Sequence, residues 1–387
     1  MKQKFNYKIF SLEPPNAAID VLSDWQGDDY PAFDRTKDIN ECLSQPYKIA
    51  AIPALFNQVG GYAYNESFCQ IDWSKFDLVL LSDIEYGSDQ FIFDYTVRRK
   101  NINNWLLAIG GVENNILPSD VIYRPWWMFQ HIRLNSFKET ESYNKPFVFD
   151  ALLGAVKAHR SYVMARFQKS DLLNKSLVTY RNIFHSPGET WISDTDPGLN
   201  YAVSKETKKI LAGDNILWPY VSPNLDPTWE VAENLKREIS EITPWDIYSK
   251  TYYSICCETL YTNPGPNKHD RPGPFFITEK TTKLLLAKRL FIMFAPMHTL
   301  KFLKEIGFKT FNDVIDESYD DCPDTVTRFK LAFDQAEILA QQDPKVILTA
   351  TKEIREHNFR HLFQYRKQIK NTMHRMILDK IPNQFCS

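Results

Sequence analysis

Short, unbroken apolar runs separated by amphipathic stretches constrain the fold of this chain more than any other feature. Residues 49–55 (IAAIPAL), 76–83 (FDLVLLSD) and 103–111 (NNWLLAIGG) are typical of buried strands, because a strand covered on both faces is apolar throughout. A polar loop and a helical stretch, residues 90–101, lie between the second and third runs. This order predicts a βαβ unit with parallel strands and a right-handed crossover.

The same alternation starts again after the polar segment 135–146. A further strand is expected at 121–127, near a sheet edge, and a second set of elements follows: strands at 146–154, 176–182, 252–259 and 289–296, with a helix over 161–173. From residue 324 the chain has helical periodicity with few helix breakers. We therefore predict an α/β fold with two Rossmann-like domains that face a cleft, followed by C-terminal helices. The expected boundaries are 1–140, 146–322 and 324–387, the last packing across both domains.

Composition narrows the class of protein. The 387 residues are too many for one ordinary core. A formal net charge of −2 lacks the basic surplus of most nucleic-acid binders. Six scattered cysteines without a CxxC pair predict reduced thiols. With no signal peptide and no apolar run of about 20 residues, the expected protein is cytoplasmic and does not bind a membrane.

The segment 252–296 has the pattern of a phosphate site. A strand ends at Glu258, and a Pro/Gly-rich loop leads to a helix with Thr278 at the N-cap and Glu279 in the first turn. Lys280 and Lys283 are three residues apart and share a helix face. A helix N-terminus with a lysine suits a diphosphate. The alternative is a simple helix cap with solvated lysines.

Three segments of the sequence resemble a known protein family. The pattern YSICCET…FFITEKTTKLLLAKRLFIMF resembles the donor segment of GT-B-fold glycosyltransferases of the fucosyltransferase and exostosin type. The stretches 145–167 and 300–321 resemble phage-encoded relatives, some of which glycosylate 5-hydroxymethylcytosine in DNA. Fucosyltransferases usually have Phe-Glu-Asn where this chain has Cys-Glu-Thr at 257–259, which argues against GDP-fucose.

The resemblance implies roles for individual residues in binding the donor. Lys280 would contact the donor diphosphate, and Arg160 would hold it from the other wall. Glu279 would bind the nucleotide ribose, and Glu258 would bind the donor or shape its pocket. Thr278 and Lys283 complete the expected donor site. No cofactor is expected beyond a nucleotide-sugar co-substrate, which we expect to be UDP-linked.

The acceptor side rests on fewer signals. Asp83 and Glu85 follow a strand and are candidates for the general base, as is His131. Trp126 and Trp127 could stack on a base or a sugar, although tryptophans more often belong to a core. No cluster has metal-ligand spacing, so no metal is expected.

Three functions remain open at this point. The first is transfer of a glucosyl, arabinosyl or similar sugar to 5-hydroxymethylcytosine in phage DNA, with base flipping. In that case duplex DNA would be the partner, and C-terminal lysines and arginines could contact it. The second is transfer to a glycan or a lipid-linked sugar. The third is a nucleotide-binding module without catalytic activity.

Overall fold

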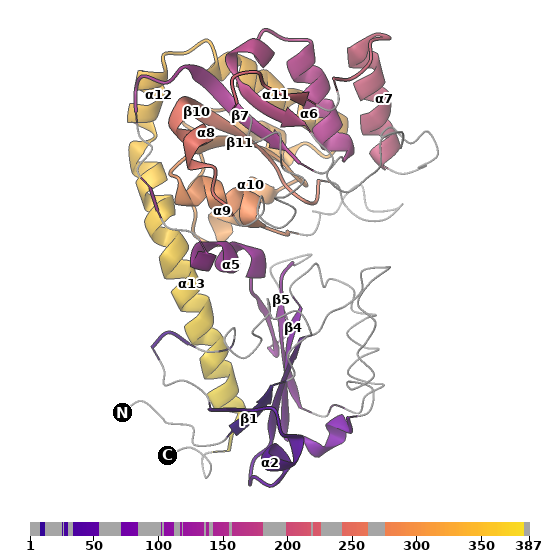
Figure 1. The fold of residues 1–387 in the computed structure, drawn as a ribbon, viewed down its shortest axis with the longest axis vertical. Helices are drawn as coiled ribbons and strands as arrows, with labels where there is room; N and C mark the ends of the chain where they lie inside the picture. The colour runs from indigo at the N-terminus through magenta and orange to yellow at the C-terminus, as the bar shows by residue number, and fades with distance from the viewer. Residues whose placement is uncertain are drawn as a thin grey trace. The chain divides into compact units, whose positions relative to one another are not determined.

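A computed structural model gives the fold of this chain. It describes residues 8–11, 25, 27–29, 34–53, 71–83, 102, 104–111, 117, 119–134, 137–138, 142–154, 157–180, 199–217, 220–225, 242–261 and 275–382. The chain divides into two compact units (Figure 1). Unit 1 comprises Met1–Trp127 and Phe363–Ser387, and unit 2 comprises Met128–Leu362.

Unit 1 contains a six-stranded sheet in the order β2-β1-β3-β4-β5-β6. Every neighbouring pair is parallel. Its elements are β1 (Lys8–Ser11), β2 (Asp34–Thr36), α2 (Ile39–Leu43), β3 (Ile49–Pro53), η1 (Trp73–Lys75), β4 (Leu78–Asp83), β5 (Trp105–Ile109) and β6 (Val121–Tyr123). The chain moves outward in opposite directions from β1 and from β3, so the strand order reverses between them.

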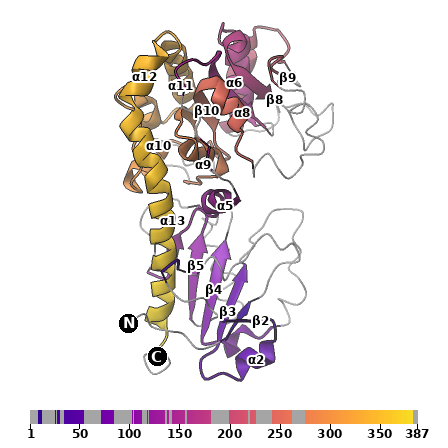
Figure 2. The same ribbon diagram turned by 60° about the vertical axis from the view of Figure 1, so that its left-hand side comes forward.

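The C-terminal part of α13 (Lys352–Lys380) packs on one face of this sheet, as Figure 2 shows. The strands contribute alternate residues to that face, such as Ile49 and Ala51 in β3 or Leu78 and Leu80 in β4. Successive strand residues point to opposite faces, which explains the spacing. Met373 and Ile377 of α13 are fully buried against them. Burying each such side chain contributes about 1.5–3 kcal/mol.

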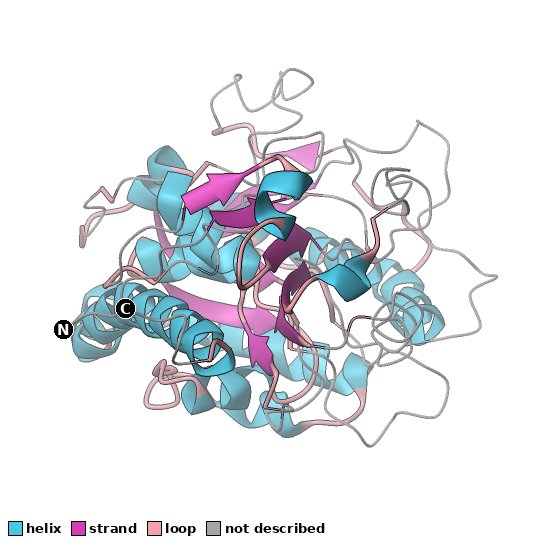
Figure 3. Cartoon of the chain, turned by 90° about the horizontal axis from the view of Figure 1, so that it is seen from below, coloured by secondary structure: helices cyan, strands magenta, loops and turns pink. Residues whose placement is uncertain are grey.

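Unit 2 contains a five-stranded sheet in the order β11-β10-β7-β8-β9. The strands are β7 (Phe147–Leu153), β8 (Leu177–Tyr180), β9 (Tyr220–Val221), β10 (Thr251–Cys257) and β11 (Leu290–Phe294). The first four strands in that order are parallel, and only β9 runs antiparallel to its neighbour β8. In Figure 3 the strands of both units (magenta) lie among helices (cyan).

Helices connect and cover the strands of unit 2. They are α5 (Trp126–Leu134), α6 (Ala158–Gln168), η2 (Leu173–Lys175), α7 (Leu199–Leu211), α8 (Trp245–Lys250), α9 (Glu279–Leu286), α10 (Thr299–Glu305), η4 (Glu317–Asp321), α11 (Thr325–Leu339) and α12 (Pro344–Ala350). Phe329 of α11 is fully buried beside Tyr162 of α6 and Phe294 of β11, with ring centroids 6.0 and 5.5 Å away. This aromatic cluster ties α11 to the sheet.

A buried ion pair joins the middle of β7 to the start of β11. Arg289, just before β11, donates to Asp150 of β7 at 2.7 Å. It also donates to the Ser254 hydroxyl and to the carbonyl groups of Tyr248 and Tyr253. Because Arg289 bonds to groups on both β7 and β10, it ties these two strands to the start of β11.

The predicted α/β class with parallel sheets is confirmed, and eight expected strands appear close to their predicted bounds. One expectation was partly wrong: the segment 121–127 is a strand only to Tyr123, and α5 begins at Trp126. Pro125 explains the change, because proline fits the start of a helix and interrupts a strand. Between the strands predicted at 176–182 and 252–259 the structure contains α7 and α8, which were not predicted. The helix predicted at 90–101 lies outside the described residues.

Candidate donor site at the end of the unit 2 sheet

The candidate site lies where the strand order of unit 2 reverses. From β7 the chain passes through α6 to β8 on one side, and from β10 it passes through α9 to β11 on the other. β7 and β10 are neighbours in the sheet. In open parallel sheets, ligands bind beyond the carboxyl ends of the strands at such a reversal. The residues that begin α6 and α9 therefore hold the position where a ligand is expected.

The helix α9 starts as its sequence predicts. Thr278 is the N-cap, with extended backbone (φ −114°, ψ −174°), and its hydroxyl accepts from the Lys280 amide at 3.4 Å. Glu279 occupies the first turn, where a carboxylate interacts favourably with the helix dipole. Leu284, Leu285 and Leu286 are buried. The helix is therefore held by its own cap and by its apolar residues.

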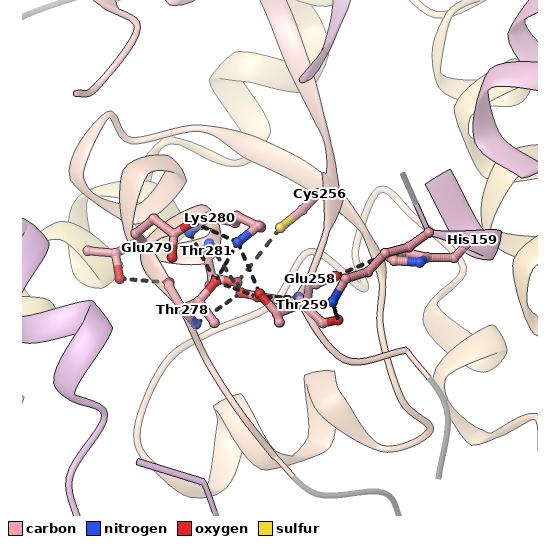
Figure 4. A network of polar contacts seen from close by, with 10 residues as sticks. His159, Cys256, Glu258, Thr259, Thr278, Glu279, Lys280 and Thr281 are labelled. Carbon is pink, nitrogen blue, oxygen red and sulfur yellow. Dashed lines mark hydrogen bonds and ion pairs between the residues drawn. The ribbon is translucent and has the colours of Figure 1, made fainter. Parts of the chain in front are cut away.

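Glu258 fastens the start of α9 to the end of β10 (Figure 4). Its side chain is almost completely buried. It accepts from the amide groups of Thr259, Thr278 and Thr281 at 3.0, 3.2 and 3.3 Å. It also accepts from the Thr278 and Thr281 hydroxyls at 2.6 and 2.5 Å. Five donors therefore surround this one carboxylate.

This network occupies backbone amide groups at the start of α9 that were expected to bind a phosphate. The Thr281 amide bonds to Glu258, and the Lys280 amide bonds to the Thr278 hydroxyl. An anion at this edge would consequently be held by side chains such as Lys280 more than by these two amides. Glu258 therefore positions the start of α9, and its proposed role at a donor site stays a prediction.

Lys280 projects from the first turn of α9 and remains partly exposed, with 28% of its side chain accessible. Its ammonium donates to Glu279 Oε1 at 2.6 Å and to Thr259 Oγ1 at 3.0 Å. Burial alone would raise the pKa of Glu279, but Lys280 and Lys283 lower it to about 2. Burial lowers the pKa of Lys283 to about 8, although Glu279 opposes that shift. At neutral pH Glu279 is therefore ionised and can only accept hydrogen bonds.

Arg160 enters the same edge from α6 and is buried. Burial lowers the pKa of Arg160, while the charges of Glu279 and Glu258 act in the opposite direction. These interactions mean that Arg160 is electrostatically coupled to residues from β10 and α9. The structure thus brings together the six residues expected to bind the donor: Arg160, Glu258, Thr278, Glu279, Lys280 and Lys283.

Three further residues at this edge, Lys157, His159 and Thr259, were not identified from the sequence. The Lys157 ammonium, at the N-cap of α6, donates to the Thr259 carbonyl at 2.8 Å. His159 lies fully buried with its Nε2 2.9 Å from the Glu258 carbonyl, and its ring stacks on Tyr261 at 4.1 Å. Burial lowers the pKa of His159 well below its ordinary value, and Arg160 and Lys157 add to that effect. One indication for Thr259 was present in the sequence, because it directly follows Glu258.

The residues expected on the acceptor side are only partly described. Asp83 is the last residue of β4, at the carboxyl end of that strand in unit 1, but its side chain is outside the described part of the structure. Glu85 and the side chains of Trp126 and Trp127 are also outside it. His131 is buried in α5, with Nε2 2.9 Å from the Thr243 hydroxyl. Their proposed roles stay predictions.

Lysines of the C-terminal helix form ion pairs within unit 1. Lys367 pairs with Asp29 at 2.9 Å, Lys370 with Asp28 at 2.5 Å and Lys380 with Asp120 at 2.7 Å. Such pairing neutralises much of the positive charge that a phosphate backbone would need. These lysines therefore contribute to holding α13 on unit 1.

The described residues contain neither a cluster of metal-binding side chains nor a membrane-spanning helix. No group of three or more His, Cys, Asp or Glu side chains could hold a metal ion. No helix there is both long and apolar enough to cross a bilayer. Comparison with protein-family models, with curated proteins and with solved structures gave no match to this chain.

Proposed function

We propose that this chain is a nucleotide-sugar-dependent glycosyltransferase of the GT-B type. In this proposal unit 2 binds the donor and unit 1 binds the acceptor. One observation carries it: cationic and carboxylate side chains from the starts of α6 and α9 gather where the unit 2 sheet reverses its strand order. That edge is where α/β proteins bind nucleotides.

The chemistry of these groups fits a sugar donor that leaves as a nucleoside diphosphate. The reaction breaks the bond between the anomeric carbon and the phosphate oxygen, and negative charge develops on the departing diphosphate. Lys280 and Arg160 would stabilise that charge, and a guanidinium group can bind two phosphate oxygens at once. Glu279, ionised and acceptor-only, would bind ribose hydroxyl groups.

Transfer also requires a base to remove the proton of the acceptor hydroxyl. We assign this role to unit 1, with Asp83 and Glu85 as the first candidates, because Asp83 ends β4 at the carboxyl edge of that sheet. The remaining candidate, His131, belongs to unit 2 instead. Trp126 and Trp127 would contact the acceptor. The proton would pass from the acceptor hydroxyl to this base as the new glycosidic bond forms.

Two acceptors are proposed. The first, 5-hydroxymethylcytosine in duplex DNA, follows from the resemblance to phage enzymes. The second is a glycan hydroxyl, and the ion pairs of Lys367, Lys370 and Lys380 favour it, because each pair lowers the positive charge available to bind DNA.

The function is tested by transfer from a panel of UDP- and GDP-sugars to hydroxymethylated DNA and to glycans, with release of UDP or GDP as the measurement. We expect release with at least one donor and its loss in Lys280→Met. Lys345→Met, on the exposed surface of α12, is the matched control and should retain wild-type activity. Absence of both binding and release in the wild-type protein would contradict the proposal. Binding of a nucleoside diphosphate without release from any donor would favour a binding module.

A further inference from the structure

Thr259 gathers two ammonium groups that come from different helices. Its carbonyl oxygen accepts from Lys157 at the start of α6, at 2.8 Å. Its hydroxyl accepts from Lys280 at the start of α9, at 3.0 Å. The Thr259 amide in turn donates to Glu258 at 3.0 Å, which fixes the residue at the end of β10. Two cations thus meet on one anchored residue, and Lys157 and Lys280 both keep part of their surface exposed.

A third cation, Arg160, follows Lys157 by three residues in the first turn of α6 and is buried. Lys157, Arg160 and Lys280 all act on His159 and favour its neutral form, after the larger effect of burial on its pKa. Glu258 and Glu279 balance part of this positive charge, and an anion between the cations would offset the remainder. The Lys157 side chain provides no acceptor for the first amide groups of α6, since a lysine side chain only donates. The Arg160 and Ser161 amides bond to the Lys157 carbonyl, so an anion at the start of α6 would be held mainly by the cationic side chains.

We propose that Lys157 is a second phosphate-binding residue, which acts with Lys280 on the other side of Thr259 to engage the two phosphate groups of a nucleoside diphosphate. The inference rests on the proposed function and makes it more specific. A nucleoside diphosphate offers one phosphate group to each lysine, whereas a nucleoside monophosphate offers one phosphate group to the pair. The site should therefore select sugars linked to a nucleoside diphosphate over sugars linked to a nucleoside monophosphate.

The test is isothermal titration calorimetry of the full chain with UDP, GDP, UMP and GMP. We expect the wild-type protein to bind one of the diphosphates at least tenfold more tightly than the matching monophosphate. Lys157→Met should weaken diphosphate binding about 10- to 100-fold, which is the effect of losing one charge-assisted hydrogen bond, and should narrow the preference over the monophosphate. Lys345→Met should change neither value.

Lys157 also holds the Thr259 carbonyl, so a second variant separates folding from binding. Lys157→Gln keeps an N–H donor but removes the charge, and thermal unfolding shows whether either variant is folded. Unchanged diphosphate affinity in a folded Lys157 variant, with weakened affinity in Lys280→Met, would overturn this inference and leave the proposed function standing. A wild-type protein that binds none of the four nucleotides and transfers no sugar would refute the proposed function itself.

Discussion

Replacing Glu258 by glutamine tests the structural basis of the donor site most directly. The substitution keeps the shape of the side chain but turns one acceptor oxygen into an N–H donor. That oxygen now accepts either from the Thr259 amide and Thr278 hydroxyl, or from the Thr278 and Thr281 amides and the Thr281 hydroxyl. A hydroxyl can rotate and become the acceptor, whereas a backbone amide cannot. In one orientation of the glutamine the half-buried Thr259 amide loses its partner, and in the other the buried Thr278 and Thr281 amides do.

The magnitude follows from two contributions. A buried amide left without a partner costs about 1–3 kcal/mol. Loss of the negative charge at the N-terminus of α9 costs a further 0.3–1 kcal/mol or so. The free energy of unfolding of unit 2 should therefore fall by about 1.5–4 kcal/mol in Glu258→Gln. Since the same contacts position Lys280, affinity for a nucleoside diphosphate should fall as well.

Urea denaturation measures the change in stability, and hydrogen–deuterium exchange of residues 279–286 reports on α9 directly. The control is Glu337→Gln, the same chemical change at a more exposed carboxylate that pairs with Arg166, where about 0–1 kcal/mol is expected. If Glu258→Gln unfolds at the wild-type urea concentration and α9 exchanges at the wild-type rate, the five-donor network does not hold the helix.

Three other predictions concern stability. Asp150→Asn leaves Arg289 buried without its carboxylate and should destabilise unit 2 by about 3–5 kcal/mol, measured by urea denaturation; a change below about 1 kcal/mol would contradict a structural ion pair. Glu279 has a folded-state pKa of about 2, below its ordinary value of 4.5, so its contribution is complete above that ordinary value and is lost as the pH falls towards 2. Acid titration of stability should therefore be shallower in Glu279→Gln, and identical acid profiles would refute this assignment. Gly307→Ala should cost at least about 1–2 kcal/mol by thermal unfolding, because φ is +96° and a Cβ atom would lie 2.6 Å from the His361 ring; a wild-type melting temperature would show that this turn can rearrange.

Local sequence patterns were sufficient to identify the residues of the candidate site that lie at the end of β10 and the start of α9. The apolar run 252–259 indicated β10 and, with it, the position of Glu258 at a strand end. Thr278 was recognised as an N-cap because threonine at the start of a helix satisfies an amide through its hydroxyl. Glu279, Lys280 and Lys283 could then be predicted, because they lie within the first five residues of the helix that Thr278 caps.

The hydrogen-bond partners of these residues could not be predicted from local sequence patterns. The contact between Lys157 and Thr259 spans 102 positions, and the contacts of Glu258 with Thr278 and Thr281 span 20 and 23. Nothing in the local pattern shows that a carboxylate at a strand end will bond to a helix cap beyond a long loop.

The amino-acid sequence by itself determined the α/β class, most strands of the two sheets and the start of α9, because these depend on the apolar pattern and on side-chain-to-backbone bonds within a few residues. Only the tertiary structure decided that β10 pairs with β7, that the strand order reverses there, and that lysines from α6 and α9 meet on Thr259. Strand order depends on long-range pairing across the whole sheet, and residue spacing along the chain does not encode which strands become neighbours.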